Sequence, residues 1–473
     1  MYSELTGTSV AMLVNNPCVN DSRVIKSAET LASLGYSVTV VCRGDVGLAD
    51  NELKNGVRYS RVQRKSFSMG YLFYGLRRAI SGDLLAISLP ARFGILTLWG
   101  FLHRAAMSMS QVTTGLIEAS RFNQPKKTNV SALNNKDAIS SHRIKDLVVN
   151  AAESAYRSLE SDEVYFVMKQ TMSSITPDII HAHDLGTLSA GVALAKKHGS
   201  KLIYDSHELE MHRHIPFTKR QAKRRKAQEA CGIALADSVL TVSESIAAYL
   251  TNDYGIRPPT VIFNSPKKPI YPSSFLSTDL RQDADFTASE PLGVYVGRVA
   301  VDRGLENILH AMVGWPELKL ATVGPQNAAF TERFLGMAEE LGVSDRLCCL
   351  DPVPSETLID YISKADFSVL PIQNVCLSYY YCLPNKLFES VLAGLPVAVS
   401  NLKDMKELVE QWRCGIVFDE TDPPAIANTL KNLYAQRDAY RLREERLEEF
   451  AQLFSWEAQE EKLERVYKDL ALA

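Results

Sequence analysis

The sequence predicts an α/β protein built from two doubly wound parallel sheets in series. Short, wholly apolar runs alternate with segments of helical periodicity, as in a parallel sheet that is covered by helices on both faces. This alternation stops at a proline-rich stretch, 266–290, and then starts again. The 473 residues, of which 46% are hydrophobic, are enough for two domains with substantial cores. Ligands are therefore expected at the carboxyl ends of strands and in the cleft between the domains.

The first half, 1–265, begins with a predicted βαβ unit. Strands are expected at 9–14 and 38–42, and the helix between them, 23–34, stops at Gly35, which tolerates the left-handed conformation of a helix end. After a long interruption the same rhythm predicts 179–182 (strand), 188–197 (helix), 201–205 (strand) and 238–242 (strand).

The second half, 291–455, repeats the pattern after the interdomain linker 266–290. Its polar and proline-rich composition is typical of a domain boundary. The elements expected here are 293–296 (strand), 305–312 (helix), 318–323 (strand), 332–341 (helix), 367–370 (strand), 386–393 (helix) and 397–399 (strand).

The segment 61–150 interrupts the first domain without repeating the βα rhythm. It carries thirteen Lys or Arg and four Asp or Glu, a net charge of +9 in a chain whose formal charge is −3. Aromatic and aliphatic residues lie among the cations, which suits interfacial helices at an anionic membrane surface. A helical pair packed on its parent domain with solvated cations explains the same composition, and both interpretations stay open.

Composition excludes several other classes of protein. The near-neutral charge gives no reason to expect a nucleic-acid partner. The eight cysteines form no CxxC pair, so neither a zinc ribbon nor a disulfide framework is indicated, and a cytoplasmic location is expected. The N-terminus lacks the features of a signal peptide. The apolar run 84–102 has the length of a membrane span, but Pro90 and Arg92 at its middle argue against a crossing.

The stretch VYVGRVAVDRGLEN predicts an anion site where a strand ends in Gly297 and Arg298 and a helix starts after Arg303 and Gly304. Glycines allow backbone N–H groups to approach a phosphate, and two guanidinium groups can bind a diphosphate without a metal. The alternative is a pair of surface arginines.

The stretch CLPNKLFESVLAGLPVAVS places Asn385 and Lys386 at the start of a helix and Glu389 one turn further on. The lysine can add charge to a bound diphosphate, and the carboxylate can accept hydrogen bonds from both ribose hydroxyls. A plain i, i+3 ion pair between Lys386 and Glu389 is the alternative.

Several short motifs, taken in order, resemble the family 4 glycosyltransferases. They are HAHD, YDSHEL, TVSES, VIFNSP, GRVAVDRG, PNKLFESVLAGLPV, FSWE and VYKDL, and the resemblance covers 9–60 and 176–473. It implies the GT-B fold, in which two Rossmann-like domains face a cleft and a C-terminal crossover helix, here 456–473, returns to the N-terminal domain.

The resemblance implies a retaining, metal-independent transfer from a nucleotide-diphosphate sugar, a uridine diphosphate sugar above all, with no cofactor. Matched by position, Arg298 and Arg303 would bind the diphosphate with Lys386 nearby, and Glu389 would hold the ribose. His183, the second histidine of HAHD, would hydrogen-bond the transferred sugar. The family commonly has a further glutamate eight residues before Glu389; here that residue is Tyr381, so the sugar stays undetermined.

The acceptor is expected on the N-terminal domain. Asn16 and Asn20 are candidate contacts in the first loop, where Asp21 is expected to cap the following helix. Asp205, His207 and Glu208 are further candidates at the end of a strand, although buried structural hydrogen bonding is an equal alternative for His207. The cluster 219–226, KRQAKRRK, suits phosphate headgroups or a lipid-diphosphate acceptor, or is a solvated helix face.

The favoured function is sugar transfer to a glycan or lipid-linked acceptor in envelope polysaccharide biosynthesis, at the inner face of the membrane. The alternatives are a sugar-nucleotide epimerase or hydrolase of the same fold and a non-catalytic scaffold. The basic insertion argues against the first alternative, and the presence of Arg298, Arg303 and Lys386 argues against the second.

Overall fold

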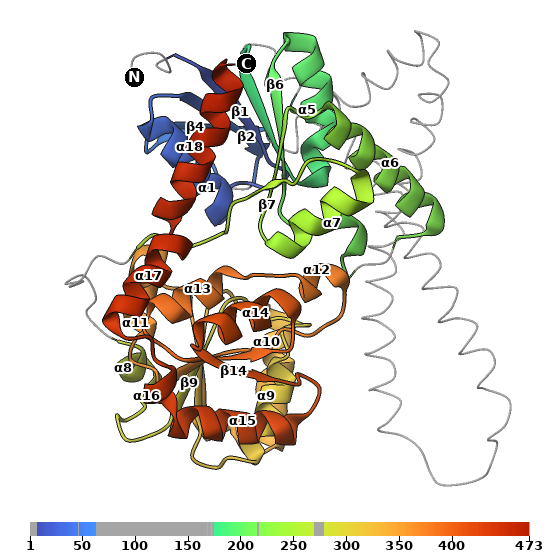
Figure 1. Ribbon diagram of the computed structural model, residues 1–473. Helices are drawn as coiled ribbons and strands as arrows, with labels where there is room; N and C mark the ends of the chain where they lie inside the picture. The colour runs from blue at the N-terminus through green and yellow to red at the C-terminus, as the bar shows by residue number, and fades with distance from the viewer. Residues whose placement is uncertain are drawn as a thin grey trace, which may run out of the picture.

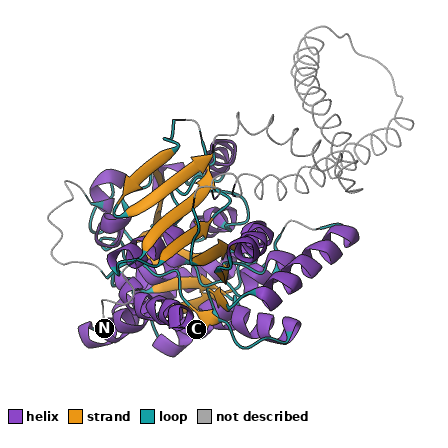
Figure 2. Cartoon of the chain, turned by 90° about the horizontal axis from the view of Figure 1, so that it is seen from above, coloured by secondary structure: helices purple, strands orange, loops and turns teal. Residues whose placement is uncertain are grey.

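The computed structural model describes residues 7–45, 47–62, 168, 172, 175–214, 217–268 and 279–472. Two parallel sheets with helices on both faces lie one above the other in Figure 1, and Figure 2 shows strands layered between helices. The insertion 61–150 and the apolar run 84–102 lie outside the described residues, apart from 61 and 62, which end a strand. Among the described helices, none combines the length and apolar character needed to cross a bilayer.

The N-terminal sheet has eight strands in the order β3-β4-β2-β1-β5-β6-β7-β8, and only β3 runs antiparallel to its neighbour. The strand β1 pairs with β2 on one side and β5 on the other, so the chain reverses its direction of winding there. The strands are β1 Ser9–Leu13, β2 Ser37–Arg43, β3 Asn51–Lys54, β4 Val57–Val62, β5 Ile179–His183, β6 Lys201–Ser206, β7 Ser238–Thr241 and β8 Thr260–Val261.

Side chains alternate along β1 between two separate cores. Val10 and Met12 pack with α1 and with the last helix, α18 (Trp456–Leu472), on one face, whereas Ala11 and Leu13 pack with α5, α6 and α7 on the other. This burial on both faces is why the strands read as continuous apolar runs. The helices described in this domain are α1 Ser22–Ser33, α5 Asp184–His198, α6 Lys219–Leu235 and α7 Glu244–Tyr254, with a 3-10 turn, η2, at Glu210–His212.

The C-terminal sheet has six strands, all parallel, in the order β11-β10-β9-β12-β13-β14. The strand β9 lies between β10 and β12, so a second reversal of winding falls next to the loop that carries Gly297. The strands are β9 Leu292–Val296, β10 Lys319–Val323, β11 Leu347–Leu350, β12 Phe367–Leu370, β13 Val397–Ser400 and β14 Gly415–Phe418.

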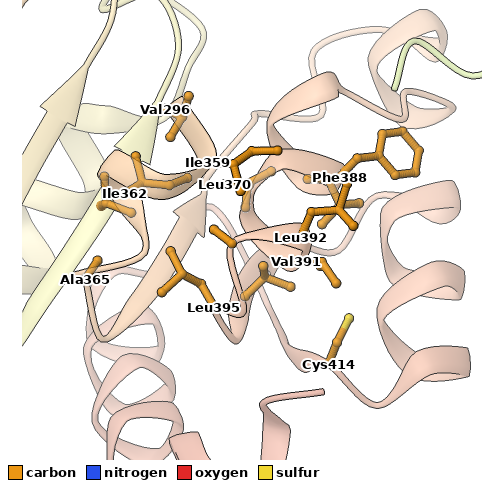
Figure 3. Close-up of a cluster of buried hydrophobic side chains, with 14 of the residues drawn as sticks. Val296, Ile359, Ile362, Ala365, Leu370, Phe388, Val391, Leu392, Leu395 and Cys414 are labelled. Carbon is orange, nitrogen blue, oxygen red and sulfur yellow. The ribbon is translucent and has the colours of Figure 1, made fainter. Parts of the chain in front are cut away.

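Helices cover both faces of this second sheet. On one face, shown in Figure 3, Phe388, Val391 and Leu392 of α13 pack against Leu370 of the sheet and Ile359 of α11. The helices α9, α10 and α15 cover the other face. Their bounds are α8 Leu280–Ala284, α9 Leu305–Val313, α10 Ala328–Glu340, η3 Ser344–Arg346, α11 Ser355–Ile362, α12 Leu377–Tyr380, α13 Asn385–Leu392, α14 Lys403–Trp412, α15 Pro423–Ala435, α16 Arg437–Tyr440 and α17 Glu444–Phe454.

The last helix, α18 (Trp456–Leu472), returns to the N-terminal domain and lies along α1 (Figure 1). Trp456 and Tyr467 are fully buried in the N-terminal core, and the indole N–H of Trp456 donates to Thr30 Oγ1 of α1 at 3.0 Å. The predicted fold with its returning C-terminal helix is confirmed. The predicted linker 266–290 also contains α8, whose Leu280 and Ala284 are buried in or against the second domain.

Candidate functional site

Two glycine loops meet at the carboxyl ends of β9 and β10. Gly297 follows β9 with a φ of +130°, and Gly324 follows β10 with a φ of +148°. A Cβ on Gly324 would lie 2.4 Å from the carbonyl oxygen of Gly297, and a Cβ on Gly297 would lie 2.8 Å from Lys386 Nζ. The glycines therefore let two backbones and an ammonium group share a space that any other residue would fill.

Lys386 is held against this loop by Tyr295, the penultimate residue of β9. Its Nζ donates to the Tyr295 hydroxyl at 3.2 Å and lies 4.7 Å from the centre of that ring. The hydroxyl in turn donates to the carbonyl oxygen of Arg298 at 3.0 Å. A chain of hydrogen bonds thus joins the first turn of α13 to the loop after β9, and it places an ammonium group beside Gly297.

The two predicted arginines lie on the loop between β9 and α9. Arg298 is exposed, whereas Arg303 is half-buried, with its guanidinium 5.6 Å from the centre of the Tyr379 ring. Neither is in a salt bridge with a described residue. Gly304, with a φ of +73°, caps α9, and a Cβ there would overlap the carbonyl oxygen of Pro371. The loop therefore offers two uncompensated guanidinium groups beside a helix N-terminus, which is an arrangement that attracts anions.

The helix α13 begins at Asn385 and carries Glu389 one turn later, as predicted. The alternative of an ion pair between Lys386 and Glu389 is not what the described residues show, since the ammonium group binds Tyr295 instead. Burial raises the pKa of Glu389, while Lys26 and Lys386 act in the opposite direction. A half-buried carboxylate between two ammonium groups can accept hydrogen bonds from a diol.

Lys26 of α1 brings the N-terminal domain to this carboxylate. Its Nζ donates to Asn264 Oδ1 at 3.2 Å and to the Ser265 carbonyl oxygen, both where the chain crosses between domains. Burial lowers the pKa of Lys26 to about 7, although the charge of Glu389 opposes the shift. The site therefore contains an amine, charged below about pH 7, that the sequence analysis did not identify.

On the N-terminal side, Arg23, His181, His183 and His207 surround the buried carboxylate of Asp205, near the end of β6. Arg23 binds both oxygens of Asp205 at 2.8 and 2.7 Å and donates to the Ile262 carbonyl oxygen at 2.6 Å. His183 Nδ1 lies 3.4 Å and His181 Nε2 lies 3.6 Å from Asp205 Oδ2. Asp205 is 1% exposed, so it supports the histidines and does not present its carboxylate to an acceptor.

The ionisation of this cluster follows from its partners. Burial alone would raise the pKa of Asp205, but Arg23 and His207 outweigh it and hold that pKa well below the usual range. Burial and the neighbouring His183 lower the pKa of His181 to about 3. Ligand atoms of His181, His183 and Asp205 lie within 4.8 Å of one another, a spacing that a metal ion could bridge. The guanidinium of Arg23 donates to both carboxylate oxygens of Asp205, so we interpret the cluster as a buried ion pair with two neighbouring histidines.

His183 ends β5, the strand next to β6, so its ring reaches the same edge of the sheet. The ring is 1% exposed, and its Nε2 has no hydrogen-bond partner among the described residues. His207 lies just beyond β6, with its ring centre 5.3 Å from that of His183. The structure thus brings together three of the predicted residues, His183, Asp205 and His207.

The remaining acceptor-side candidates have local partners. Glu208 Oε2 binds Arg213 Nε at 2.9 Å, and burial raises the pKa of Glu208 against the opposing charge of Arg213. Asn16 donates to Asp21 Oδ2 at 2.8 Å and accepts from the backbone N–H of Cys18, so it shapes its own loop. Asn20 is exposed. Asp21 caps α1 as predicted, since its carboxylate accepts from the Val24 N–H.

The two halves of the site touch through Tyr381 and its neighbours. Ser243, the N-cap of α7, donates to the Tyr381 carbonyl oxygen at 3.0 Å. The backbone N–H of Leu209 donates to Ser378 Oγ at 3.2 Å, and Lys403 donates to Ser245 Oγ at 2.8 Å. A pocket of about 370 Å³ opens at this junction, lined by residues of α7 together with Tyr381 and Lys403. The loops after β6 and β7 therefore bind the segment that leads into α13.

Sequence reasoning missed Arg23, Lys26, Tyr295 and Asp184. A signal existed for the first two, because Arg23, Lys26 and Thr30 follow helical spacing and lie on the buried face of α1. Cations at apolar positions of an amphipathic helix indicate buried partners. The partners themselves lie 182 and 238 residues away, which no local pattern reveals.

Comparisons with known proteins agree with this architecture. The family model of glycosyl transferases group 1 matches 277–452, and that of glycosyltransferase family 4 matches 135–265. The D-inositol 3-phosphate glycosyltransferase of Corynebacterium diphtheriae is 24% identical over 310 residues, 62% of this chain and 71% of the relative. The protein of the same name from Thermobifida fusca is 24% identical over 276 residues, 55% of this chain and 62% of the relative.

Solved structures show the same fold at low identity. Sucrose-phosphate synthase from Thermosynechococcus elongatus superposes with a TM-score of 0.65 at 18% identity, covering 98% of this chain and 99% of its own. Anabaena HepE in complex with UDP-glucose superposes with a TM-score of 0.61 at 12% identity, over 98% and 99% of the two chains. Fold and site together define a glycosyltransferase of GT-B architecture. Its N-terminal part matches the model of glycosyltransferase family 4 and its C-terminal part that of glycosyl transferases group 1.

Proposed function

We propose that the enzyme transfers a sugar, with retention of anomeric configuration, from a nucleotide-diphosphate sugar bound by the C-terminal domain. The observation that carries this proposal is the close approach of Lys386 Nζ to the loop at Gly297, where a Cβ would lie 2.8 Å from the ammonium group. A phosphate placed there meets an ammonium group, two guanidinium groups and a helix N-terminus, which together can stabilise a leaving diphosphate without a metal ion. A uridine diphosphate sugar is the expected donor, in keeping with the UDP-glucose bound by HepE.

Each residue has one role in this proposal. Arg298, Arg303 and Lys386 bind the diphosphate, Asn385 lies at the helix end that faces it, and Glu389 accepts the ribose hydroxyls. His183, with its unpartnered Nε2, hydrogen-bonds the transferred sugar. No cofactor or metal is required, because the cations of the protein balance the charge of the leaving group.

Calorimetric titration of UDP and UDP-glucose tests the donor site. Arg298→Ala should weaken both ligands about tenfold or more, because a charge-assisted hydrogen bond contributes about 1.5 to 3 kcal/mol. Arg446→Ala is the matched control, since Arg446 is also exposed but pairs with Glu449 within α17. Unchanged UDP affinity in the Arg298 variant, with the protein folded, contradicts the assignment.

For the acceptor, we propose a glycan or lipid-linked precursor of envelope polysaccharide. The cluster 219–226 supports this choice, because it begins α6 with five exposed cations on the acceptor side of the molecule: Lys219, Arg220, Lys223, Arg224 and Lys226. A soluble phosphorylated cyclitol is the second candidate, favoured by the relatives named D-inositol 3-phosphate glycosyltransferase. Assays with UDP-glucose and either a membrane extract or inositol 3-phosphate separate the two.

We further propose that the enzyme works in the cytoplasm at the inner face of the membrane. The +9 charge of 61–150 and the cations of α6 would bind anionic lipid, each contributing about 1 kcal/mol at most near the surface. The protein should sediment with anionic vesicles at low salt, and high salt should release it. Binding to neutral vesicles as strong as to anionic ones, or to neither, contradicts the proposal.

The competing functions give different products. A hydrolase releases free sugar at a rate that no acceptor changes, and an epimerase converts the nucleotide sugar without releasing UDP. A scaffold binds the donor and leaves it intact. Product analysis by NMR, with and without acceptor, distinguishes all of these from transfer.

A further inference from the structure

His207 lies between two carboxylates and one imidazole. Its Nδ1 is 3.5 Å from Asp184 Oδ2, and its Nε2 is 3.2 Å from both Asp205 Oδ2 and His183 Nδ1. The ring is 17% exposed, whereas Asp205 and His183 are buried. His207 therefore contacts His183 at Nδ1, and the other ring nitrogen of His183, Nε2, stays unpartnered among the described residues.

Asp184 reinforces this placement through its backbone. It directly follows His183 as the first residue of α5, and its φ of +60° is in the left-handed region that side chains disfavour. Its Oδ1 accepts from the backbone N–H of His207 at 3.3 Å, while Oδ2 faces the His207 ring. A strained residue beside a functional one persists only when its surroundings hold it there, and here the carboxylate binds both the backbone and the ring of His207.

The geometry also fixes where the protons lie. Because both ring nitrogens of His207 face carboxylate oxygens, both carry protons; burial would lower the pKa of His207, but Asp184 and Asp205 outweigh it and raise it to about 9. The 3.2 Å contact between His207 Nε2 and His183 Nδ1 is a hydrogen bond that needs one donor and one acceptor; because His207 Nε2 carries a proton, His183 Nδ1 is the acceptor. His183 is then neutral with its proton on Nε2, and this buried N–H has no partner among the described residues.

We propose that the Asp184–His207 pair positions His183 as the Nε2–H tautomer, so that His183 donates a hydrogen bond to an oxygen of the transferred sugar. His207 is in this view a positioning residue that does not touch the donor. Asp205, fixed by Arg23, is the second support, because its carboxylate lies 3.2 Å from His207 Nε2 and its charge favours the protonated ring. The inference rests on the proposed function only for the identity of the oxygen that receives the hydrogen bond.

Two substitutions at one position separate positioning from folding. His207→Phe keeps a ring but removes both donors, which frees His183 Nδ1 to take the proton and donate it to Asp205. His207→Gln keeps an N–H near the place of Nε2 and should preserve the tautomer. His212→Phe is the matched control, because His212 is also partly buried but pairs with the Tyr249 hydroxyl at 2.6 Å.

The ¹⁵N spectrum of histidine-labelled protein reads the tautomer directly, and His183→Asn assigns the signals by removing them. We expect a protonated Nε2 at His183 in the wild type, in His207→Gln and in His212→Phe, and a protonated Nδ1 in His207→Phe. A protonated Nδ1 in the wild type, or an unchanged tautomer in His207→Phe, overturns the inference.

Turnover of UDP-glucose supplies an independent measure. His207→Phe should lower kcat about tenfold, the equivalent of one hydrogen bond, and His207→Gln should restore most of it. The affinity for UDP should stay the same, because UDP lacks the transferred sugar that His183 would contact. Unchanged kcat in His207→Phe counts against the inference. If the wild type turns over no nucleotide sugar, the proposed function fails, while the ¹⁵N spectrum still decides on the tautomer.

Discussion

Replacing Arg23 by methionine tests whether the buried ion pair with Asp205 holds the N-terminal half of the site together. The two side chains are 3% and 1% exposed and share two hydrogen bonds, of 2.8 and 2.7 Å, and Arg23 makes a third to Ile262. Methionine keeps much of the side-chain volume but leaves the carboxylate without its guanidinium. Removing one partner of a buried pair costs about 3 to 5 kcal/mol, and we expect a loss of unfolding free energy in that range at pH 7.5.

The loss should depend on pH. In the wild type the pKa of Asp205 is lower in the folded than in the unfolded protein, so the pair stabilises the fold above about pH 4 and less as the pH falls further. Without Arg23, burial should raise the folded pKa of Asp205 above the unfolded one. The loss of unfolding free energy in Arg23→Met is then largest at neutral pH. It becomes smaller as the pH falls toward the pKa of Asp205 in the unfolded protein, because protonation neutralises the carboxylate.

Urea denaturation at pH 7.5 and pH 5 measures both effects. Arg333→Met is the control, because Arg333 is 59% exposed and its pair with Glu306 at 3.3 Å should contribute about 1 kcal/mol or less. A loss for Arg23→Met no greater than that of the control, or one that is larger at pH 5 than at pH 7.5, refutes the reasoning. The ion pair would then not be the support of the histidine cluster.

Three further predictions concern the donor. Glu389→Gln should weaken UDP binding by about 1.5 to 3 kcal/mol in calorimetry, and less for 2′-deoxy-UDP; equal losses would contradict contact with the ribose. Lys26→Met removes a charge that lowers the pKa of Glu389, so the acid limb of UDP binding should move to higher pH, and an unmoved limb would show that the charges are independent. NMR of the first-formed product should show a retained anomeric configuration, and an inverted product would contradict the proposed mechanism.

The strands and helices could be predicted because their signal is local. The strand predicted at 367–370 is observed over the same residues, and the helix predicted at 23–34 is observed at Ser22–Ser33 with Asp21 as its cap. The pair β3 and β4 was missed, since its strands are short and one is mostly exposed. The turn between them, Asn55-Gly56, has positive φ at both residues, and this dipeptide is the strongest short-range signal of a hairpin.

The positions of the residues that we propose to bind the donor could also be predicted, for a related reason. Gly297, Arg298 and Arg303 lie within one loop, and Lys386 and Glu389 lie within one helical turn, so the sequence itself places each group. What joins the two groups is Tyr295, whose hydroxyl links Lys386 to Arg298. Nothing in the sequence of a buried strand indicates that its tyrosine makes such a link. The hydrogen bonds of Tyr295 follow only from the position of α13 relative to β9.

The acceptor half could not be predicted in the same way, because its groups meet through contacts between distant segments. His207 was open to a catalytic or a structural interpretation, and the decisive contact, with the αL residue Asp184, depends on a backbone angle that composition does not encode. Asp205 was expected to face an acceptor, yet Arg23 of α1 binds both its oxygens. A carboxylate at the end of a strand can bind an acceptor or form a buried ion pair, and the presence of a cation such as Arg23 decides between these two roles.

Lys26 shows why the two halves are one site. Its ammonium group binds Asn264 and Ser265 where the chain first crosses between domains, and it lies 4.8 Å from the ring of Trp456, where the chain crosses back. The same charge acts on Glu389 in the opposite domain. A change in the angle between the domains moves Lys26 relative to Glu389, and by reciprocity a ligand that changes the charge of Glu389 changes the preferred angle. If the donor binds Glu389 as proposed, we expect donor binding and domain arrangement to be coupled through Lys26, a residue that need not touch the donor.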